Sequence, residues 1–276
     1  FTGVEAPLPA PEALPREEEE GEVPGAQSDV PLPEPGEEAA RGRLRAFLEA
    51  KLARYAEERD RLDGEGGSRL SPYFALGVLS PREAAFRALA QGGEGARKWV
   101  SELLWRDFSY HLLYHFPYMA EKPLDERLEA LPWQADEALF RAWYRGQTGV
   151  PLVDAAMREL HATGFLSNRG RMVAAQFAVK YLLLPWKRCE EAFRHLLLWA
   201  GGLGVDAAPY FRLFNPLLQG ERHDPERRWL RRWAPEYPSY APQDPVVDLE
   251  AARRRYLSLA GGLLRGKGYP AGPPSP

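Results

Sequence analysis

Apolar side chains recur at intervals of three and four residues along most of the chain after residue 36, which is the spacing of one face of an α-helix. Leu44, Phe47, Leu48, Leu52 and Tyr55 form the first such face and predict a helix that runs to about residue 61. The same spacing predicts helices over residues 80–90, 96–115, 136–145, 151–161, 168–184, 188–199 and 249–259. We find no convincing run of alternating apolar and polar residues. We therefore expect an all-α fold.

One of these helices has a clear start signal. Ser80 can cap the helix through its side chain, Pro81 suits the first helical position, and Glu83 completes a capping box. We therefore expect a helix to begin at Pro81.

Residues 1–36 differ in composition from the rest of the chain. They contain eight prolines, nine acidic residues and one basic residue, and they show no apolar periodicity. Such a segment cannot bury enough apolar surface to offset the entropy lost on ordering. We predict an interdomain linker over residues 1–36, a helical domain over residues 37–276, and an upstream domain that this sequence lacks. A propeptide or a plain tail is the alternative.

Composition narrows the classes of protein further. With 45% hydrophobic residues the chain can form a sizeable core, and Cys189 alone cannot make an internal disulfide or a thiolate metal cluster. The longest apolar run, residues 196–205, is shorter than the roughly 18 residues that span a bilayer. We expect a cytoplasmic monomer with no membrane partner and no metal. The residues after 36 carry a net charge of +5, and most of their cationic side chains are arginines. Arginine suits phosphate contacts, but such a composition also fits an ordinary solvated surface.

Two segments carry candidate chemistry. Residues 67–71 form a turn of small residues, hydroxyl groups and a guanidinium, which suits a phosphate or, alternatively, an ordinary capped loop. Trp99, Glu102, Trp105 and Arg106 are expected to share roughly one side of a helix and to line a single cavity. A carboxylate between two indoles is either a costly packing choice or a ligand contact.

Five motifs occur in an order and at separations typical of one family: residues 67–73, 99–108, 148–158, 164–172 and 206–216. Together they resemble the flavin-binding helical domain of DNA photolyases and cryptochromes, most of all bacterial photolyases that repair cyclobutane pyrimidine dimers. The resemblance covers about residues 37–260. It implies a multi-helix FAD-binding domain without the family's N-terminal α/β antenna domain, FAD as cofactor, damaged DNA as partner, and deoxyribodipyrimidine photo-lyase activity.

The resemblance also implies which residues bind the cofactor. These are Tyr55, Gly67, Ser68, Arg69, Leu70, Ser71, Trp99, Arg106, Asn168 and Arg171. Gly67 stands where relatives often have Thr, so we expect a modestly weaker site.

A second set is implied to act on the DNA lesion. The substrate contacts are Arg59, Glu102, Trp105, Arg169, Met172, Trp199 and Arg212, and the catalytic residues are Glu102, Asn168, Trp133 and Trp186. In these roles the arginines clamp phosphates, Trp105 stacks on the flipped dimer and Glu102 hydrogen-bonds a base edge. Trp133 and Trp186 correspond to the outer and middle members of a tryptophan relay that reduces the flavin. Light-driven electron transfer from reduced FAD then opens the cyclobutane ring.

The resemblance is interrupted after Leu198. About a dozen family residues have no counterpart between Leu198 and Asp206, including a carboxylate expected to pair with Arg171. Either a segment is omitted from the sequence, which we favour because both flanks match the family, or a deletion impairs flavin binding. Dimer repair is therefore the main prediction. A cryptochrome-like blue-light photoreceptor and a flavin-deficient DNA-binding remnant are the alternatives.

Overall fold

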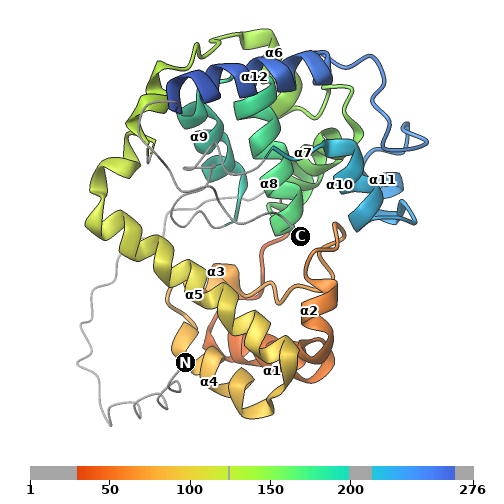
Figure 1. The fold of residues 1–276 in the computed structure, drawn as a ribbon. Helices are drawn as coiled ribbons and strands as arrows, with labels where there is room; N and C mark the ends of the chain where they lie inside the picture. Colours follow the sequence, from red (N-terminus) through yellow and green to blue (C-terminus); the bar gives the residue numbers. More distant parts are fainter. Residues whose placement is uncertain (1–29, 124, 199–212, 265–276) are drawn as a thin grey trace, which may run out of the picture.

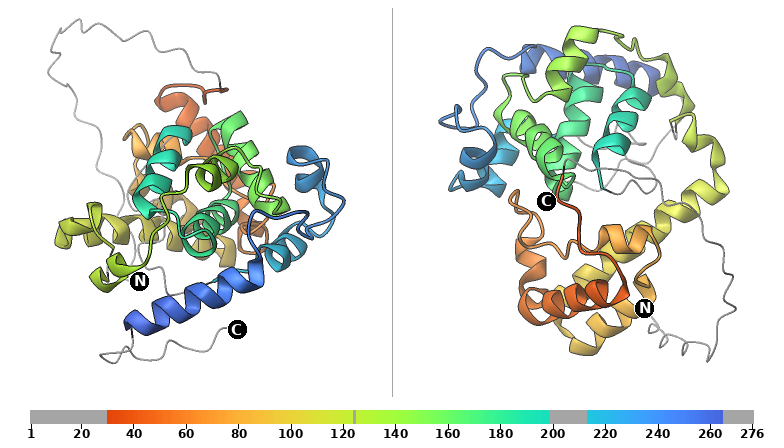
Figure 2. Two further views of the ribbon diagram at one scale, coloured as in Figure 1. Left: turned by 90° about the horizontal axis from the view of Figure 1, so that it is seen from above. Right: turned by 180° about the vertical axis from the view of Figure 1, so that it is seen from behind.

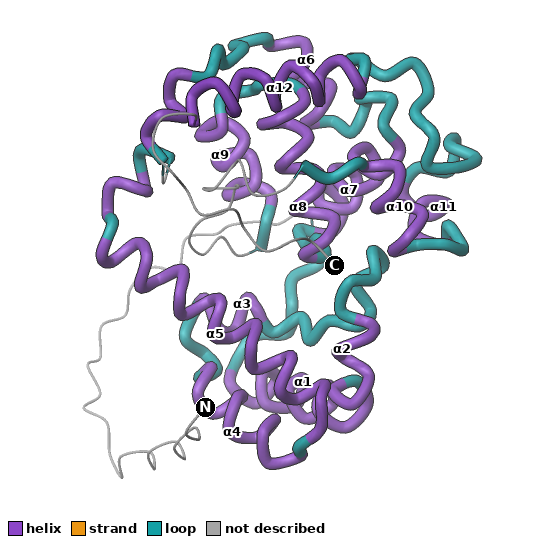
Figure 3. Tube along the Cα trace, in the orientation of Figure 1, coloured by secondary structure: helices purple, strands orange, loops and turns teal. Residues whose placement is uncertain are grey.

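The computed structural model describes residues 30–123, 125–198 and 213–264, and every regular element in these ranges is helical (Figures 1 and 3). The α-helices are α1 (Glu37–Ala50), α2 (Tyr55–Glu58), α3 (Ser71–Ala75), α4 (Pro81–Gln91), α5 (Gly93–His115), α6 (Glu137–Tyr144), α7 (Pro151–Thr163), α8 (Asn168–Gln176), α9 (Trp186–Leu196), α10 (Pro216–His223), α11 (Arg228–Trp233) and α12 (Leu249–Leu264). Shorter elements are the 3-10 helices η1 (Leu52–Arg54), η2 (Pro117–Ala120) and η3 (Glu126–Ala130) and the π-helix η4 (Phe177–Tyr181). The all-α prediction is confirmed. The predicted linker falls largely on residues 1–29, outside the described residues.

Residues 30–103, which we call the N-terminal lobe, pack around one apolar cluster. Leu44, Phe47 and Leu48 on α1 meet Trp99 and Leu103 on α5, as the apolar spacing predicts. The hydrophobic effect is the main force that holds this lobe together, because its buried cluster consists of aliphatic and aromatic side chains.

The start of α4 follows the sequence signal. Ser80 is the N-cap, its hydroxyl accepts a hydrogen bond from the Glu83 backbone N–H at 3.5 Å, and Pro81 takes the first helical position. The predicted start at Pro81 is confirmed.

The first predicted helix is wrong in one respect, because it does not continue unbroken to residue 61. The backbone leaves the helical conformation at Lys51, and η1 and α2 follow. At the break, α5 approaches so closely that a Cβ on Gly95 would lie 1.8 Å from the Leu52 carbonyl oxygen. Close packing against α5 is therefore possible only because residue 95 is glycine.

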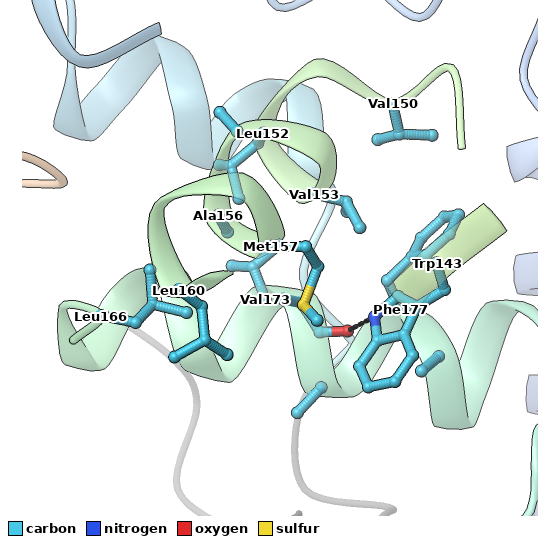
Figure 4. Close-up of a cluster of buried hydrophobic side chains, with 14 of the residues drawn as sticks. Trp143, Val150, Leu152, Val153, Ala156, Met157, Leu160, Leu166, Val173 and Phe177 are labelled. Carbon is cyan, nitrogen blue, oxygen red and sulfur yellow. Dashed lines mark hydrogen bonds between the residues drawn. The ribbon is translucent and has the colours of Figure 1, made fainter. Parts of the chain in front are cut away.

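Residues 125–198 and 213–264 form the C-terminal lobe around α7 and α8. Met157 and Leu160 on α7 face Val173 and Phe177 (Figure 4). Trp143 is fully buried among them, and its indole N–H donates to the Ala174 carbonyl at 3.0 Å. A buried indole needs such an acceptor, because an unpaired N–H is costly away from water.

The C-terminal lobe also buries carboxylates. Asp154 on α7 accepts hydrogen bonds from the Thr148 N–H at 2.7 Å, the Thr148 hydroxyl at 2.6 Å, the Gly149 N–H at 3.0 Å and the Tyr237 hydroxyl at 2.7 Å. This set of donors satisfies both carboxylate oxygens and fixes a loop that is distant in sequence onto α7.

Two helices of this lobe were not predicted, and one was predicted too long. α10 and α11 have only eight and six residues, and Pro225 lies between them, so neither has an apolar periodicity of useful length. The helix expected over residues 168–184 is α8 followed by the π-helix η4, and Leu183 then adopts a left-handed φ of 52°.

The two lobes meet along a limited seam (Figure 2). α5 begins in the N-terminal lobe and leads through η2 toward the C-terminal lobe, while Leu62 inserts into the C-terminal core and donates its N–H to the His223 carbonyl at 3.3 Å. Within the described residues, no helix combines the length and the hydrophobicity that crossing a membrane requires.

Candidate functional site

Charged side chains from α5, α8 and the turn after α2 form a continuous chain at the seam between the lobes. The Arg59 guanidinium pairs with the Glu102 carboxylate, and its Nε lies 3.8 Å from Asp60 Oδ1. The same Asp60 oxygen lies 3.0 Å from Arg169 Nη2. We call Glu102, Arg59, Asp60 and Arg169 the interlobe ion-pair chain. It brings together three of the residues predicted to bind DNA, although they are far apart in sequence.

Arg169 is held on further sides by α10 and the segment before it. Its Nη1 donates to Gln219 Oε1 at 3.3 Å, and its guanidinium carbon lies 5.5 Å from the centre of the Phe214 ring. Its Nε is buried and has no hydrogen-bond partner within the described ranges. Burial lowers the pKa of the neighbouring His223, and the charge of Arg169 acts in the same direction.

The turn over residues 67–71 connects the lobes a second time. Arg69 adopts a left-handed φ of 54°, and its guanidinium lies 4.8 Å from the centre of the Phe165 ring. Leu70 is fully buried, its N–H donates to the Ser68 hydroxyl at 3.4 Å, and Ser71 begins α3. The buried Leu70 anchors the turn while Ser68 and Ser71 stay partly accessible.

Gly67 leaves room at this turn. A Cβ built on it would meet one atom within 4 Å, the Gly64 carbonyl oxygen at 3.3 Å. The larger side chain that relatives carry therefore fits with a small adjustment, so glycine is not required here for packing.

The aromatic residues of α5 divide between core and surface. Trp99 is 3% exposed and lies 4.9 Å from Phe47, which also makes an edge contact with Tyr55. Trp105 is 61% exposed and makes an edge contact with Phe108. The expectation that these two rings share one side of the helix is therefore wrong. Trp105 follows Trp99 by six residues, which is a rotation of about 600° around the helix axis, or about 240° from the direction of Trp99.

Arg106 faces the end of α3. Its Nη2 donates to the Phe74 carbonyl at 3.3 Å, its Nη1 lies 3.4 Å from Asp107, and its guanidinium lies 4.7 Å from the Tyr110 ring centre. It is therefore held close to the turn over residues 67–71.

Tyr55, another residue predicted to bind the cofactor, is neutral. Burial raises the pKa of the Tyr55 hydroxyl, which stays protonated at neutral pH.

The start of α8 presents polar groups beside the ion-pair chain. Ser167 caps the helix by accepting from the Gly170 N–H at 3.1 Å, and the exposed Asn168 amide donates to Met172 Sδ at 3.4 Å. Burial lowers the pKa of the Arg171 guanidinium. Arg171 nevertheless has an interaction partner, so the unpaired cation that the gap suggested is not present.

The two predicted relay residues belong to the C-terminal lobe. Trp133 follows η3 and Trp186 begins α9, and both are partly buried against the same apolar cluster. Lys187 Nζ lies 5.9 Å from the Trp186 ring centre. Trp199 and Arg212, the remaining predicted contacts, lie outside the described residues.

Two of the cavities among the described residues bear on the site prediction. One, of about 260 Å³, lies at the seam and is lined by Asp60, Arg61, Asp63 and His223 among others. The other, of about 430 Å³, lies on α1 and α4 beside Arg41 and Arg87. Neither is lined by a residue predicted to bind the cofactor.

Sequence reasoning missed two members of the site, Asp60 and Gln219. Asp60 directly follows Arg59, and an acidic residue next to a predicted phosphate-binding arginine was a usable signal. Gln219 had no such signal, because its helix was not predicted.

Comparison with known proteins gives one consistent relationship. Residues 99–272 match the family described as the FAD binding domain of DNA photolyase. The chain is 80% identical to deoxyribodipyrimidine photo-lyase from Thermus thermophilus over 96% of its own length and 66% of that protein. The chain thus spans slightly less than two thirds of this relative.

Solved structures agree with this relationship. A class III photolyase from Agrobacterium tumefaciens matches with a TM-score of 0.74 at 35% identity, over 84% of this chain and 57% of that one. A cryptochrome from Synechocystis matches with a TM-score of 0.73 at 29% identity, over 81% and 56%.

The alignment with the Thermus protein also bears on the interrupted resemblance. It extends over 278 positions, more than the 276 residues of this chain, so it contains positions of the relative that have no counterpart here. This agrees with a gap relative to the family. The family match covers more than half of the 276 residues. The chain therefore belongs to the FAD-binding domain family of DNA photolyases.

Proposed function

We propose that this chain binds FAD and DNA containing a cyclobutane pyrimidine dimer, and that it repairs the dimer in a light-driven reaction. The interlobe ion-pair chain carries the proposal, because residues with implied roles in lesion and phosphate binding meet there from α5, α8 and the turn after α2. The name of the Thermus relative, deoxyribodipyrimidine photo-lyase, supports the same reaction.

The side chains at the seam fit FAD chemically. Arg69, Ser68 and Ser71 offer a cation and two hydroxyls for a diphosphate. Arg171 adds a second, partly accessible cation, and positive charge suits the anionic diphosphate of FAD. Trp99, Arg106 and Asn168 would lie nearer the ring, and Tyr55, Gly67 and Leu70 would line the remainder of the site.

In the proposed reaction, bound FAD supplies light absorption and one-electron transfer. The exposed ring of Trp105 stacks on the extruded bases. The Glu102 carboxylate accepts a hydrogen bond from a base edge, and Asn168 and Met172, which already contact each other, lie against the same bases. Base extrusion costs least at a badly stacked dimer, which favours damaged sites.

The other implied residues act on the DNA backbone and on electron supply. Arg59, Arg169 and Arg212 contact phosphates on either side of the lesion. Trp199 contributes a second stacking surface. Trp133 and Trp186 carry electrons from the protein surface toward the cofactor.

Illumination of the FAD-reconstituted, reduced chain with an oligonucleotide that contains one thymine dimer tests the proposal. Recovery of thymine absorbance in the light, and not in the dark, is the expected result. Glu102→Gln should slow repair by about tenfold, because it keeps an acceptor oxygen but removes the charge, and a loss of about 1.4 kcal/mol corresponds to one factor of ten. Glu94→Gln, an exposed site on the same helix, is the matched control. Absence of light-dependent repair while reduced flavin is bound would overturn the proposal.

A photoreceptor role is the second candidate, favoured by the structural match to a cryptochrome. Flavin photoreduction without dimer loss would support it. A chain that stays colourless after FAD addition, yet binds duplex DNA with strong salt dependence, would instead indicate a flavin-deficient DNA-binding remnant.

The remaining features of the proposal concern organisation. We infer that residues 1–36 are an interdomain linker and residues 37–276 one functional domain, which acts as a cytoplasmic monomer without a metal. Light scattering of the purified chain at micromolar concentration measures the oligomeric state directly.

A further inference from the structure

The Asp60 carboxylate contacts an arginine from each of the two lobes. It lies on the turn after α2 in the N-terminal lobe, and its Oδ1 contacts Arg59 at 3.8 Å and Arg169 at 3.0 Å. Arg169 comes from α8 in the C-terminal lobe. One oxygen atom therefore fixes the separation of two guanidinium groups that no regular element connects.

The surroundings of Arg169 make this contact decisive for its orientation. Gln219 accepts from Nη1, Asp60 pairs with Nη2, and the Phe214 ring lies below the guanidinium. The guanidinium is planar and carries five N–H donors in a fixed fork, so two held nitrogens define where the other donors point. Asp60 supplies the charged half of this support.

We propose that Asp60 is a positioning residue for DNA binding, which holds Arg169 and Arg59 at the spacing required by the phosphates that flank the lesion. This inference rests on the proposed function, in which both arginines contact the DNA backbone. Asp60 itself does not touch the DNA.

The sign of one mutational effect separates this role from simple electrostatics. A carboxylate near a polyanion repels it, so removing an Asp60 charge that had no positioning role would strengthen DNA binding. If Asp60 positions Arg169, removing the same charge weakens binding, because the arginine fork is released to other rotamers. The two roles therefore predict opposite changes in Kd.

Fluorescence anisotropy of the full chain with a duplex that carries one thymine dimer measures this change. We expect Asp60→Asn to weaken binding by about tenfold. The slope of log K against log salt should fall in magnitude by about 0.9, which corresponds to one lost phosphate contact. Asp60→Glu keeps the charge that pairs with Arg169. Its Kd should therefore stay within about threefold of the parent value, compared with about tenfold for Asp60→Asn.

Asp63→Asn is the matched control. Asp63 lines the same seam cavity of about 260 Å³ as Asp60, and it pairs with Arg61, which has no implied DNA contact. Its removal should leave Kd unchanged or lower it slightly. A Kd for Asp60→Asn that is equal to or lower than that of the parent chain would overturn the positioning role.

The failure of this inference can be told apart from the failure of the proposed function. Arg169→Gln should weaken binding, and the double variant Asp60→Asn/Arg169→Gln should bind no more weakly than Arg169→Gln alone. If the parent chain shows no preference for the dimer duplex, the proposed function fails. Additive effects in the double variant would overturn only the role of Asp60. Thermal unfolding of Asp60→Asn is measured alongside, because the Arg169 side chain is only 14% exposed, and a weaker Kd without a matching loss of melting temperature excludes a folding defect.

Discussion

The two lobes are stabilised by different kinds of interaction. The N-terminal lobe encloses an apolar cluster with Glu83 at its margin, whereas the C-terminal lobe buries Asp154, Glu159, Asp224 and Lys180 among its apolar residues. In the C-terminal lobe these polar groups connect segments distant in sequence, as the contact of Asp224 with the Tyr240 hydroxyl at 2.7 Å illustrates. Polar contacts of this kind specify which loops meet, while the buried cluster of the N-terminal lobe depends mainly on packing. Mutations should therefore act through unpaired polar groups in one lobe and through steric fit in the other.

The largest effect is expected at Asp154. Asp154→Ala leaves the buried N–H and hydroxyl of Thr148 without their acceptor, so the free energy of unfolding should fall by about 4 kcal/mol. Urea unfolding followed by circular dichroism measures the change. Tyr237→Phe, which removes one donor to the same carboxylate, should cost only about 1 kcal/mol. Equal losses in the two variants would show that the Thr148 contacts add nothing to the hydrogen bond from Tyr237.

Glu159 should make the C-terminal lobe sensitive to pH. Burial raises the pKa of its carboxyl to about 7, although the Trp229 indole N–H donates to it at 2.8 Å. The folded protein thus binds this proton more tightly than the unfolded chain, whose value is near 4.5. Stability should fall as pH rises from about 4.5 to 7, by about 3 kcal/mol in total, and then level off.

Glu159→Gln is expected to remove this dependence and to be more stable than the parent chain above pH 7. Urea unfolding at pH 5, 6, 7 and 8 tests it, with Glu250→Gln on the exposed face of α12 as control. An unchanged pH profile in Glu159→Gln would exclude Glu159 as its source.

In the N-terminal lobe, Gly95 should be the most sensitive position of α5. A Cβ there would collide with the Leu52 carbonyl, so Gly95→Ala should destabilise by about 2 kcal/mol. Gly42→Ala on α1 meets no atom within 4 Å and should stabilise by about 0.8 kcal/mol through helix propensity. The melting temperatures of Gly95→Ala and Gly42→Ala compare the cost of a steric clash with the gain in helix propensity. A stabilised Gly95→Ala chain would show that α5 can move away from the break.

The smallest effect is expected at the start of α4. Ser80→Ala removes the acceptor of the Glu83 N–H and should cost about 1 kcal/mol. The neighbouring Arg82→Ala should change stability by less than about 0.5 kcal/mol, because Arg82 is exposed. Differential scanning calorimetry resolves this difference. Similar melting temperatures for both variants would mean that the cap contributes nothing.

Local signals in the sequence account for much of the fold. The Ser80 cap and the apolar face of α1 were predicted correctly, because each depends on residues within one or two helical turns. The break at Lys51 was not predicted, and the close approach of Gly95 at this point involves another helix. Periodicity describes one helix at a time and contains no information about such an approach.

The candidate site divides in the same way. The family resemblance implied a role in DNA binding for Arg59, Glu102 and Arg169, yet not that Arg59 and Glu102 pair with each other. The sequence places Asp60 beside Arg59, but its contact with Arg169 became visible only when α8 was seen beside the end of α2. Separation along the chain hides this contact, since no local pattern links position 60 with position 169.

The buried first half of α5 has a mechanical consequence for its exposed second half. Ten residues separate Gly95 from Trp105, a length of about 15 Å along a stiff rod, so a tilt of about 4° at the anchored end displaces the outer ring by about 1 Å. Displacements of that size in reacting groups can reduce rates about a hundredfold. A methyl group added in the core at Gly95 could therefore disturb chemistry at a distance through leverage, even where the fold survives.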